Sequence, residues 1–175
     1  MLIDTATYIL MQSIENPVIT TITSTISLIF DPITFTIIAL AISAYLFFKS
    51  RKKQSLFLAS AILITAAIIK LSKEIIQRAR PPTALIQETS YAFPSGHTTM
   101  AVVFLGLITY MFTKNKSTKT KTTATLIIIF IVLAIIFSRI YLRVHWLTDT
   151  IAGFVLGLII LIISIKIYNK IITSS

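Results

Sequence analysis

Three short clusters of polar residues stand out in this sequence because they combine cations, histidines and a carboxylate at regular spacing. The first runs from Lys73 to Pro81 and places Arg80 seven residues after Lys73. Seven residues are close to two turns of an α-helix, so both cations would project from the same helical face. Pro81 and the proline after it would then stop the helix. The alternative is a pair of cations that snorkel from a helix end to a membrane interface.

The second cluster is the sequence Phe93-Pro-Ser-Gly-His97. Gly96 would let backbone N–H groups approach an anion closely, and a helix beginning here would add the positive end of its dipole. Ser95 offers a hydroxyl group, and His97 offers an acid or base near neutral pH. A turn that leads into a helix N-cap would explain the same residues without any chemistry.

The third cluster joins Ser138 and Arg139 to His145 and Asp149. His145 and Asp149 are four residues apart, so on a helix the carboxylate would face the imidazole and hold its Nδ1–H. Nε2 would then stay unprotonated, as a nucleophile requires. Arg139 and His145 would diverge on one continuous helix, which predicts a turn between them. The alternative is a structural His–Asp pair at an interface, with Trp146 in an aromatic belt.

Long apolar segments surround these clusters. Hydrophobic residues make up 55% of the 175 residues and charged residues only 13%, whereas soluble domains carry about 25% charged residues. That composition excludes disordered, collagen-like and nucleic-acid-binding proteins. Five runs approach the roughly 20 residues that a helix needs to cross a bilayer. They are Ile33–Phe48, Ser55–Leu71, Thr98–Phe112, Ala124–Tyr141 and Thr150–Tyr168.

We therefore predict an all-α integral membrane helical bundle with about five transmembrane helices, forming a single domain over residues 1–175. The bundle proper would occupy residues 31–170 and the three clusters residues 73–149. Residues 1–30 are apolar but interrupted by polar side chains, and apolar residues recur at helical spacing from Val18 to Ile29. That pattern is typical of amphipathic helices lying in the membrane interface. A sixth, poor span is the alternative.

The absence of certain residue types also sets expectations. Residues 1–48 contain no Lys or Arg, so we expect no cleavable signal peptide. The chain has no cysteine, which excludes disulfides, cysteine metal sites and a thiol nucleophile.

The charges predict the orientation of the bundle. Ten cations, with no acid among them, follow the first and third spans or close the chain. These are Lys49, Arg51, Lys52, Lys53, Lys114, Lys116, Lys119, Lys121, Lys166 and Lys170. The other six cations and all six acids fall at the opposite end. By the positive-inside rule we expect the amino terminus outside and the carboxyl terminus in the cytoplasm. Both histidines then lie at the outer face, together with Lys73, Arg80 and Arg139.

Three cations, a glycine turn and two histidines at one end have the composition of a phosphate cradle with a nucleophile and an acid. On these residues the sequence resembles the type 2 phosphatidic acid phosphatase superfamily, which also includes glucose-6-phosphatase and the vanadium haloperoxidases. The signature of that superfamily is Lys-x6-Arg-Pro, then Pro-Ser-Gly-His, then Ser-Arg-x5-His-x3-Asp. All three parts are present in order, without departure, over residues 73–149.

The resemblance implies a role for each matching residue. His145 would attack phosphorus and form a phosphohistidine, Asp149 would orient His145, and His97 would protonate the leaving group. A second set would hold the phosphoryl oxygens. This set comprises Lys73, Arg80, Arg139, Ser95 and the Gly96 amide. The resemblance implies no metal and no other cofactor, since the cations supply the charge. Arg143 lies outside the signature, and we expect Arg143→Lys to be tolerated.

The resemblance further implies an integral membrane lipid phosphatase whose active site lies at the extracytoplasmic face. We expect a polyprenyl diphosphate of the undecaprenyl or dolichyl type as substrate, with recycling of a carrier lipid as the result. Phosphatidylglycerophosphate and phosphatidate are alternatives, because the signature recognises only a phosphate. A vanadate haloperoxidase fits less well, since those relatives are soluble and much larger. A transporter fits less well because five spans contain no inverted repeat. The expected partners are the lipid substrate and the bilayer, not nucleic acid.

Overall fold

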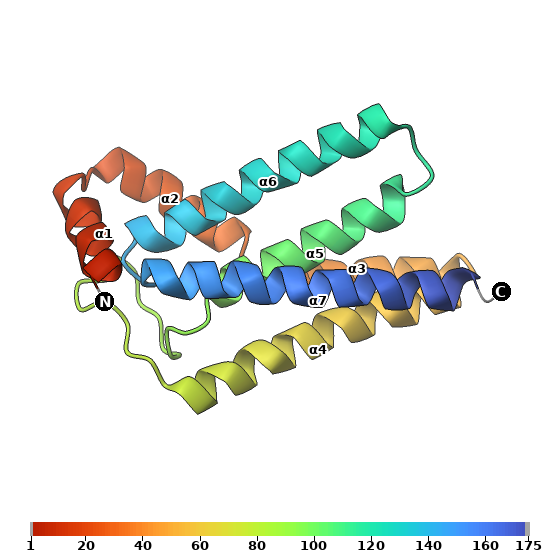
Figure 1. Ribbon diagram of the computed structural model, residues 1–175, viewed down its shortest axis with the longest axis horizontal. Coiled ribbons are helices and arrows are strands. Elements are labelled where there is room, and N and C mark those ends of the chain that lie inside the picture. The colour runs from red at the N-terminus through yellow and green to blue at the C-terminus, as the bar shows by residue number, and fades with distance from the viewer. Residues whose placement is uncertain (1, 174–175) are drawn as a thin grey trace.

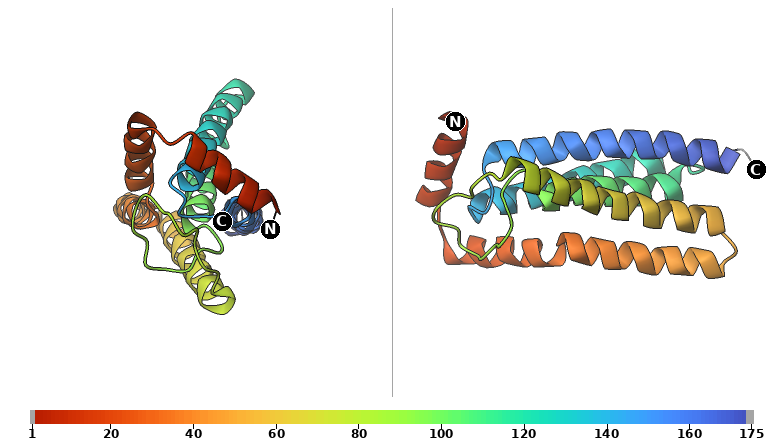
Figure 2. Two further views of the ribbon diagram at one scale, coloured as in Figure 1. Left: turned by 90° about the vertical axis from the view of Figure 1, so that its left-hand side faces the viewer. Right: turned by 90° about the horizontal axis from the view of Figure 1, so that it is seen from below.

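The protein is built from helices that form one bundle and a cover over one of its ends. The computed structural model describes residues 2–173, with side chains as far as residue 171. Within that range it contains α1 (Leu2–Ser13), α2 (Pro17–Ile29), α3 (Pro32–Phe48), α4 (Lys52–Ile76), α5 (Gly96–Thr113), α6 (Thr118–Tyr141) and α7 (Leu147–Thr173). Helices α3 to α7 run along the long axis, α1 lies across one end, and α2 slants past the end of α6 toward the start of α3 (Figure 1). The end-on view in Figure 2 shows the same arrangement.

The sharp bends between the first three helices follow from local capping. Asn16 precedes Pro17, and its side chain accepts a backbone N–H from the first turn of α2 at 2.8 Å. Asp31 precedes Pro32 and accepts a backbone N–H from the first turn of α3 at 2.7 Å. Proline fits the first helical position because the N–H there has no partner within the helix. The chain is thereby broken twice before it enters the bundle.

Five segments are long and apolar enough to cross a membrane. The first is the stretch Pro17–Phe48, which joins α2 to α3, and the others are α4, α5, α6 and α7 as far as Ile171. The prediction of an all-α membrane protein with five spans is confirmed. Helix α3 runs along the bundle and α2 precedes it at a slant (Figure 1), so we assign the first crossing to α3. The location of α1 and α2 in the membrane interface stays a prediction.

Helix α5 is the centre of the bundle and packs against α3, α4, α6 and α7. Two glycines of α7 allow the closest of these approaches. A Cβ atom at Gly153 would lie 2.7 Å from the carbonyl oxygen of Ser95, and one at Gly157 would lie 2.8 Å from a valine side chain of α5. Small residues commonly permit such contacts between membrane helices. They hold the first turn of α5 against the first turns of α7.

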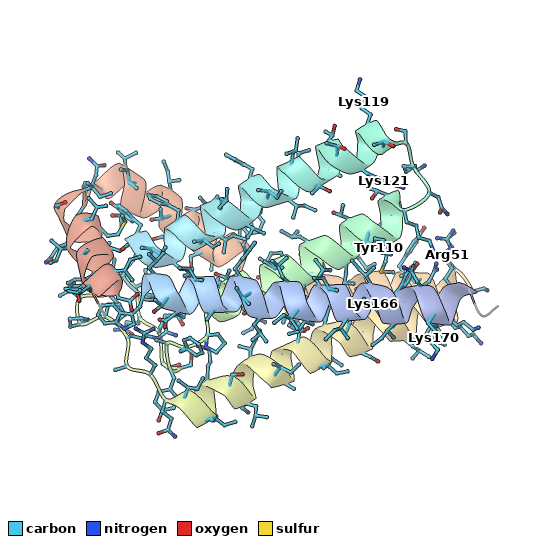
Figure 3. The ribbon with its side chains drawn as sticks, in the orientation of Figure 1. Arg51, Tyr110, Lys119, Lys121, Lys166 and Lys170 are labelled. Atoms are coloured by element: carbon cyan, nitrogen blue, oxygen red, sulfur yellow. The ribbon has the colours of Figure 1, made fainter. Side chains whose placement is uncertain are left out.

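The two ends of the bundle carry different charges. The cations labelled in Figure 3 gather at the end away from α1 and α2. They are Arg51, Lys119, Lys121, Lys166 and Lys170. All six acidic residues lie at the opposite end, in ion pairs or beside a cavity there. The separation of charge predicted from the sequence is therefore present in space. Which end faces the cytoplasm stays a prediction.

Candidate active site

The three sequence clusters meet at the end of the bundle where α1 and α2 lie. A cavity of about 440 Å³ lies there. Its wall includes members of all three clusters, namely Lys73, Arg80, Gly96, His97 and His145. The cavity continues between α3 and α4, where Ile33, Ala66 and Ile69 form an apolar wall. Residues far apart in the chain thus share one site with a polar head and an apolar flank.

The first cluster reaches the cavity by a different route from the one expected. Helix α4 ends at Ile76, and Gln77 caps it in the left-handed region with a φ of 50°. The Gln77 N–H donates to the carbonyl of Lys73 at 2.9 Å, which is a common way to end a helix. Arg80 therefore lies in the following loop, and the prediction that it shares a helical face with Lys73 is wrong. Both side chains still line the cavity because the loop folds back over it.

The Arg80 guanidinium is oriented by the backbone of two loops. Its Nε donates to the carbonyl of Ser90 at 2.7 Å, and its Nη1 donates to the carbonyl of Val144 at 2.5 Å. The same Nη1 lies 3.4 Å from Nε2 of His145. Lys73 is held in a similar way, because its Nζ donates to the carbonyl of Tyr91. The two cations are thus fixed beside the imidazole of the third cluster.

Arg139 is fully buried in the last turn of α6. Its Nη1 donates to the hydroxyl of Ser27 on α2, and its Nη2 donates to the carboxylate of Glu88. Its Nε has no hydrogen-bond partner among the residues that the structure describes. A buried donor without a partner is uncommon in proteins. A bound anion would satisfy it.

Glu88 is a site residue that sequence reasoning missed. Its carboxylate accepts from Arg139 and also lies 3.5 Å from Nη2 of Arg80. It is the only acid between the first and second clusters, and that was the one signal that could have revealed it. A carboxylate between two guanidiniums has the same hydrogen-bonding geometry as a phosphoryl group. A bound phosphate would have to compete with Glu88 for these donors.

His145 lies in the turn between α6 and α7. Helix α6 ends at Tyr141 and α7 begins at Leu147, so the predicted turn between Arg139 and His145 is confirmed. The prediction that His145 faces Asp149 along one helix is wrong. The turn nevertheless brings His145 Nδ1 to 3.5 Å from Asp149 Oδ2. That separation is longer than an ordinary N–H···O hydrogen bond.

The charge state of His145 follows from its surroundings. Burial lowers the pKa of His145 well below its usual range, and the cations of Arg139, Arg80 and Lys73 lower it further. The imidazole is therefore neutral at neutral pH, with Nε2 toward the guanidinium of Arg80. A neutral imidazole is the form that can act as a nucleophile.

Asp149 is fully buried in the first turn of α7 and both of its oxygens are occupied. Oδ2 accepts the N–H of Trp146 at 2.9 Å, as in a capping box. Oδ1 accepts from Nη1 of Arg78 at 2.5 Å. Arg78 was not singled out from the sequence, although it lies within the first cluster. The carboxylate that faces His145 is thus held from two sides.

His97 lies in the first turn of α5, and its Nε2 is 3.4 Å from Oδ2 of Asp31. The sequence places no carboxylate within a few residues of His97. Its acidic neighbour in the structure, Asp31, comes instead from the junction of α2 and α3. The two histidines differ instead in what surrounds Nε2, which faces Arg80 in His145 and Asp31 in His97.

Ser95 and Gly96 occupy different positions in the second cluster. Ser95 is fully buried, and its Oγ accepts from the hydroxyl of Thr98 at 3.1 Å while it caps α5. A hydroxyl used as a cap does not line the cavity, so a phosphate contact from Ser95 stays a prediction. Gly96 does line it, and a Cβ there would lie 3.3 Å from a methyl group of Ile69. The amino end of α5 therefore borders the cavity directly.

Arg143 lies outside the three signature clusters but is held tightly in the structure. Arg143 is 4% exposed, adopts a φ of 53°, and donates to Glu15 and to the carbonyl of Thr83, each at 2.8 Å. A lysine could not make both contacts, so the basis for expecting Arg143→Lys to be tolerated is lost.

Among the described residues, no group of three or more His, Cys, Asp and Glu side chains forms a metal site.

Comparison with known proteins identifies the family. A sequence model of the PAP2 superfamily matches residues 54–173, and the chain belongs to this superfamily. It is 35% identical to phosphatidylglycerophosphatase B of Bacillus subtilis, over 68% of this chain and 60% of that protein. It is 32% identical to an undecaprenyl-diphosphatase of Sulfolobus acidocaldarius, over 70% of this chain and 59% of that protein. The chain thus spans about three-fifths of the length of these curated relatives.

A solved structure shows the same fold. The crystal structure of a transmembrane PAP2-type phosphatidylglycerolphosphate phosphatase from Bacillus subtilis is similar with a TM-score of 0.87. The two chains are 28% identical, and the match covers 95% of this chain and 85% of that one.

Proposed function

We propose that this protein is an integral membrane phosphatase that hydrolyses a lipid phosphate through a phosphohistidine on His145. The observation that carries the proposal is the convergence of three sequence clusters on one cavity at the end of the bundle. Membership of the PAP2 superfamily and similarity to phosphatases of lipid phosphates support it.

The proposed reaction has two steps. Nε2 of His145 attacks phosphorus, and the bond between phosphorus and the leaving oxygen breaks while His97 donates a proton to that oxygen. Asp31, beside His97, would stabilise the protonated imidazole. A water molecule, losing its proton to His97, then attacks phosphorus and releases inorganic phosphate and neutral His145. No group beyond the chain and water is needed to balance either step.

The cations would supply the electrostatic part of catalysis. Lys73 and Arg80 border the cavity, and Arg139 offers a buried Nε–H without a partner among the described residues. Charge spreads over the equatorial oxygens during phosphoryl transfer, and fixed cations stabilise it. A metal ion would have the same task, which is why we propose no metal and no cofactor.

The shape of the site favours a lipid over a soluble phosphate ester. The cavity continues between α3 and α4 along Ile33, Ala66 and Ile69, on the sides of two membrane spans. An apolar tail lying there would stay within the bilayer while the phosphate reached His145. Buried apolar surface stabilises such a complex by about 25 cal/mol for each Å² removed from water.

Lys70 favours a lipid with two phosphates. It lies one turn before Lys73 on α4 and borders the same cavity. We propose polyprenyl diphosphate as the substrate, since its second phosphate adjoins the one that is removed. Phosphatidylglycerophosphate also carries two phosphates and is the second candidate, favoured by the similarity to the two Bacillus subtilis proteins.

A phosphate-release panel tests this proposal. The purified protein in detergent micelles is given polyprenyl diphosphate, phosphatidylglycerophosphate and phosphatidate. We expect the two-phosphate lipids to be hydrolysed faster, and Lys70→Ala to slow them more than phosphatidate. Lys121→Ala, at the other end of the bundle, is the matched control. Equal loss on all three lipids would contradict the role of Lys70, and no phosphate release from any of them would contradict the proposed function.

The active site would face the outside of the cell, with the amino terminus outside and the carboxyl terminus in the cytoplasm. Because the chain has no cysteine, single cysteines report topology without background. Thr89→Cys and Asn115→Cys change exposed residues at opposite ends of the bundle. An impermeant thiol reagent added to intact cells should label the first variant and not the second. The reverse pattern would invert the assignment.

A further inference from the structure

Helix α1 places a buried carboxylate at the active-site end of the bundle. Asp4 is only 4% exposed, although most of α1 is exposed. Its two oxygens accept from Thr148 N at 2.9 Å, from Thr148 Oγ1 at 2.8 Å and from Arg78 Nη2 at 2.7 Å. Burial raises the pKa of Asp4, but these hydrogen bonds outweigh burial and hold it below its usual value. Asp4 is therefore an anion beside the first turn of α7.

Arg78 joins this carboxylate to Asp149. Its Nη2 donates to Asp4, while its Nη1 donates to Asp149 Oδ1 and to Thr148 Oγ1, at 2.5 and 2.7 Å. The guanidinium also lies over the ring of Trp146, at 5.7 Å from its centroid. The planar fork of arginine can serve two carboxylates at once, whereas a lysine ammonium cannot match that geometry. One cation thus bridges an acid of α1 and an acid of α7.

The bridge fixes the orientation of Asp149. Arg78 holds Oδ1 and the N–H of Trp146 holds Oδ2, so the carboxylate cannot rotate. Oδ2 is the oxygen that faces His145 Nδ1. A His–carboxylate pair depends on such outer contacts, because they set the ring orientation and the basicity of the imidazole.

The bridge also sets the charge beside His145. Arg78 alone would neutralise Asp149, leaving little negative potential at the imidazole. Asp4 adds a second negative charge on the far side of Arg78, so the group of three carries a net charge of minus one. His145 becomes positive when Nε2 bonds to phosphorus, and a nearby negative charge stabilises that form.

We infer that Arg78 and Asp4 are positioning residues for Asp149, and that α1 thereby belongs to the active site. This inference rests on the proposed function, in which Asp149 supports the nucleophile His145. In this arrangement neither Arg78 nor Asp4 contacts the phosphate. Both act through Asp149. Asp4 lies outside the three signature clusters, and Arg78 lies within the first cluster but is not one of its signature residues.

A second ion pair offers a matched control. Glu15 and Arg143 also tie the amino-terminal segment to the turn before α7, with 2.8 Å between Oε2 and Nη1. This pair has no contact with Asp149 or His145 in the described structure. A loss caused merely by loosening the amino-terminal segment should appear equally when either pair is broken.

The experiment compares kcat and KM of Asp4→Asn, Arg78→Ala and Glu15→Gln on the lipid that the wild type hydrolyses fastest. We expect Arg78→Ala to lower kcat by about tenfold or more, and Asp4→Asn by about threefold to tenfold, with KM changed by less than about twofold. Glu15→Gln should stay within about twofold of the wild type in kcat. Thermal unfolding in detergent checks that each variant is folded, and Asp4→Asn carries the test should Arg78→Ala unfold.

Chemical rescue separates positioning from folding. The Arg78 side chain is 28% exposed, so a small cation from solution can reach its place. Added guanidinium at millimolar concentration should raise kcat of Arg78→Ala and leave the wild type and Glu15→Gln unchanged. Equal losses in Asp4→Asn and Glu15→Gln, or no rescue of a folded Arg78→Ala, would overturn the inference.

Asp149→Asn distinguishes failure of the positioning role of Arg78 and Asp4 from failure of the proposed function. An inactive Asp149→Asn with normal Asp4→Asn and Arg78→Ala would overturn the positioning role alone. Full activity of Asp149→Asn, or no phosphate release by the wild type, would overturn the proposed function and the inference with it.

Discussion

The two ends of the bundle treat their charges in opposite ways. At the end covered by α1 and α2, Arg139 and Asp149 have no exposed surface, and each forms an ion pair. At the other end Lys119 and Lys121 are exposed, and none of the described acids lies near them. The sequence indicates which end holds the acids, but not that Arg139 and Asp149 are buried there.

Under the proposed function the buried charges take part in catalysis, and under the predicted orientation the exposed cations set topology. Burying an ion costs several kcal/mol unless a partner compensates for the lost water. At one end of the bundle ion pairs with Glu88 compensate for burial of Arg80 and Arg139, beside the cavity that His145 lines. Exposed cations cost little and suffice to keep a loop in the cytoplasm. Equal substitutions at the two ends should therefore have unequal effects.

The largest effect is expected for His145→Ala, because the covalent step loses its nucleophile. Phosphate release should fall by about 10³-fold or more for every lipid substrate. Lys121→Ala should leave the rate within about twofold of the wild type. A His145→Ala variant that keeps more than a few per cent of the activity would contradict the assignment of His145 as the nucleophile.

Next come Arg80→Lys and Arg139→Lys, which keep the charge but lose the planar fork. Each should lower kcat/KM by more than about tenfold, or about 1.4 kcal/mol of transition-state stabilisation. Arg51→Lys makes the same change at an exposed position of the other end and should have no measurable effect. Because Arg139 is fully buried, thermal unfolding must show that its variant is folded. Equal losses at all three positions would mean that the planar guanidinium is not specifically required at Arg80 and Arg139.

A smaller and selective effect is expected for His97→Ala. A leaving group of low pKa departs without a proton, so the first step should slow less for an aryl phosphate or a diphosphate than for a monoester of an alcohol. The rate of the first step is measured as the burst in which the leaving group is released. Plotted against leaving-group pKa, this rate should rise steeply toward low pKa for His97→Ala and stay flat for His145→Ala. The same slope for both variants would contradict the separate roles of the two histidines.

The smallest effect is expected for Glu88→Gln, and its sign is opposite. This change removes the carboxylate that competes for Arg80 and Arg139. Inorganic phosphate should then inhibit the enzyme at about threefold to tenfold lower concentration, a gain of about 0.6–1.4 kcal/mol. Weaker inhibition by phosphate would show that Glu88 supports the cradle rather than competes for it.

The sequence predicts the bundle well because the signals for membrane helices are local. Uninterrupted apolar runs identify the spans, and the polar residues around Asn16 and Asp31 mark the breaks before them. The predicted ends are less accurate. The left-handed conformation of Gln77 ends α4 before Arg80, and nothing in the residue type of a glutamine announces it.

The candidate site is predictable where its residues form clusters in the chain, and not where single residues arrive from elsewhere. Spacing points to His97, His145 and Asp149, which the structure brings to one end of the bundle. Asp4 reaches the site because α1 folds across that end (Figure 2), and Asp31 reaches it from the junction of α2 and α3. Such contacts depend on tertiary packing, for which one sequence carries no periodic or spacing signal.

The central claim is that phosphate is transferred to His145, and trapping the phosphoenzyme tests it most directly. Rapid denaturation during turnover of a labelled lipid phosphate should capture a base-stable, acid-labile phosphoramidate, and peptide mapping should place it on His145. His97→Ala should accumulate this species with a good leaving group, because the histidine that activates water in the second step is missing. His145→Ala should yield no labelled protein. Label on His97, or an intact label in His145→Ala, would contradict the account.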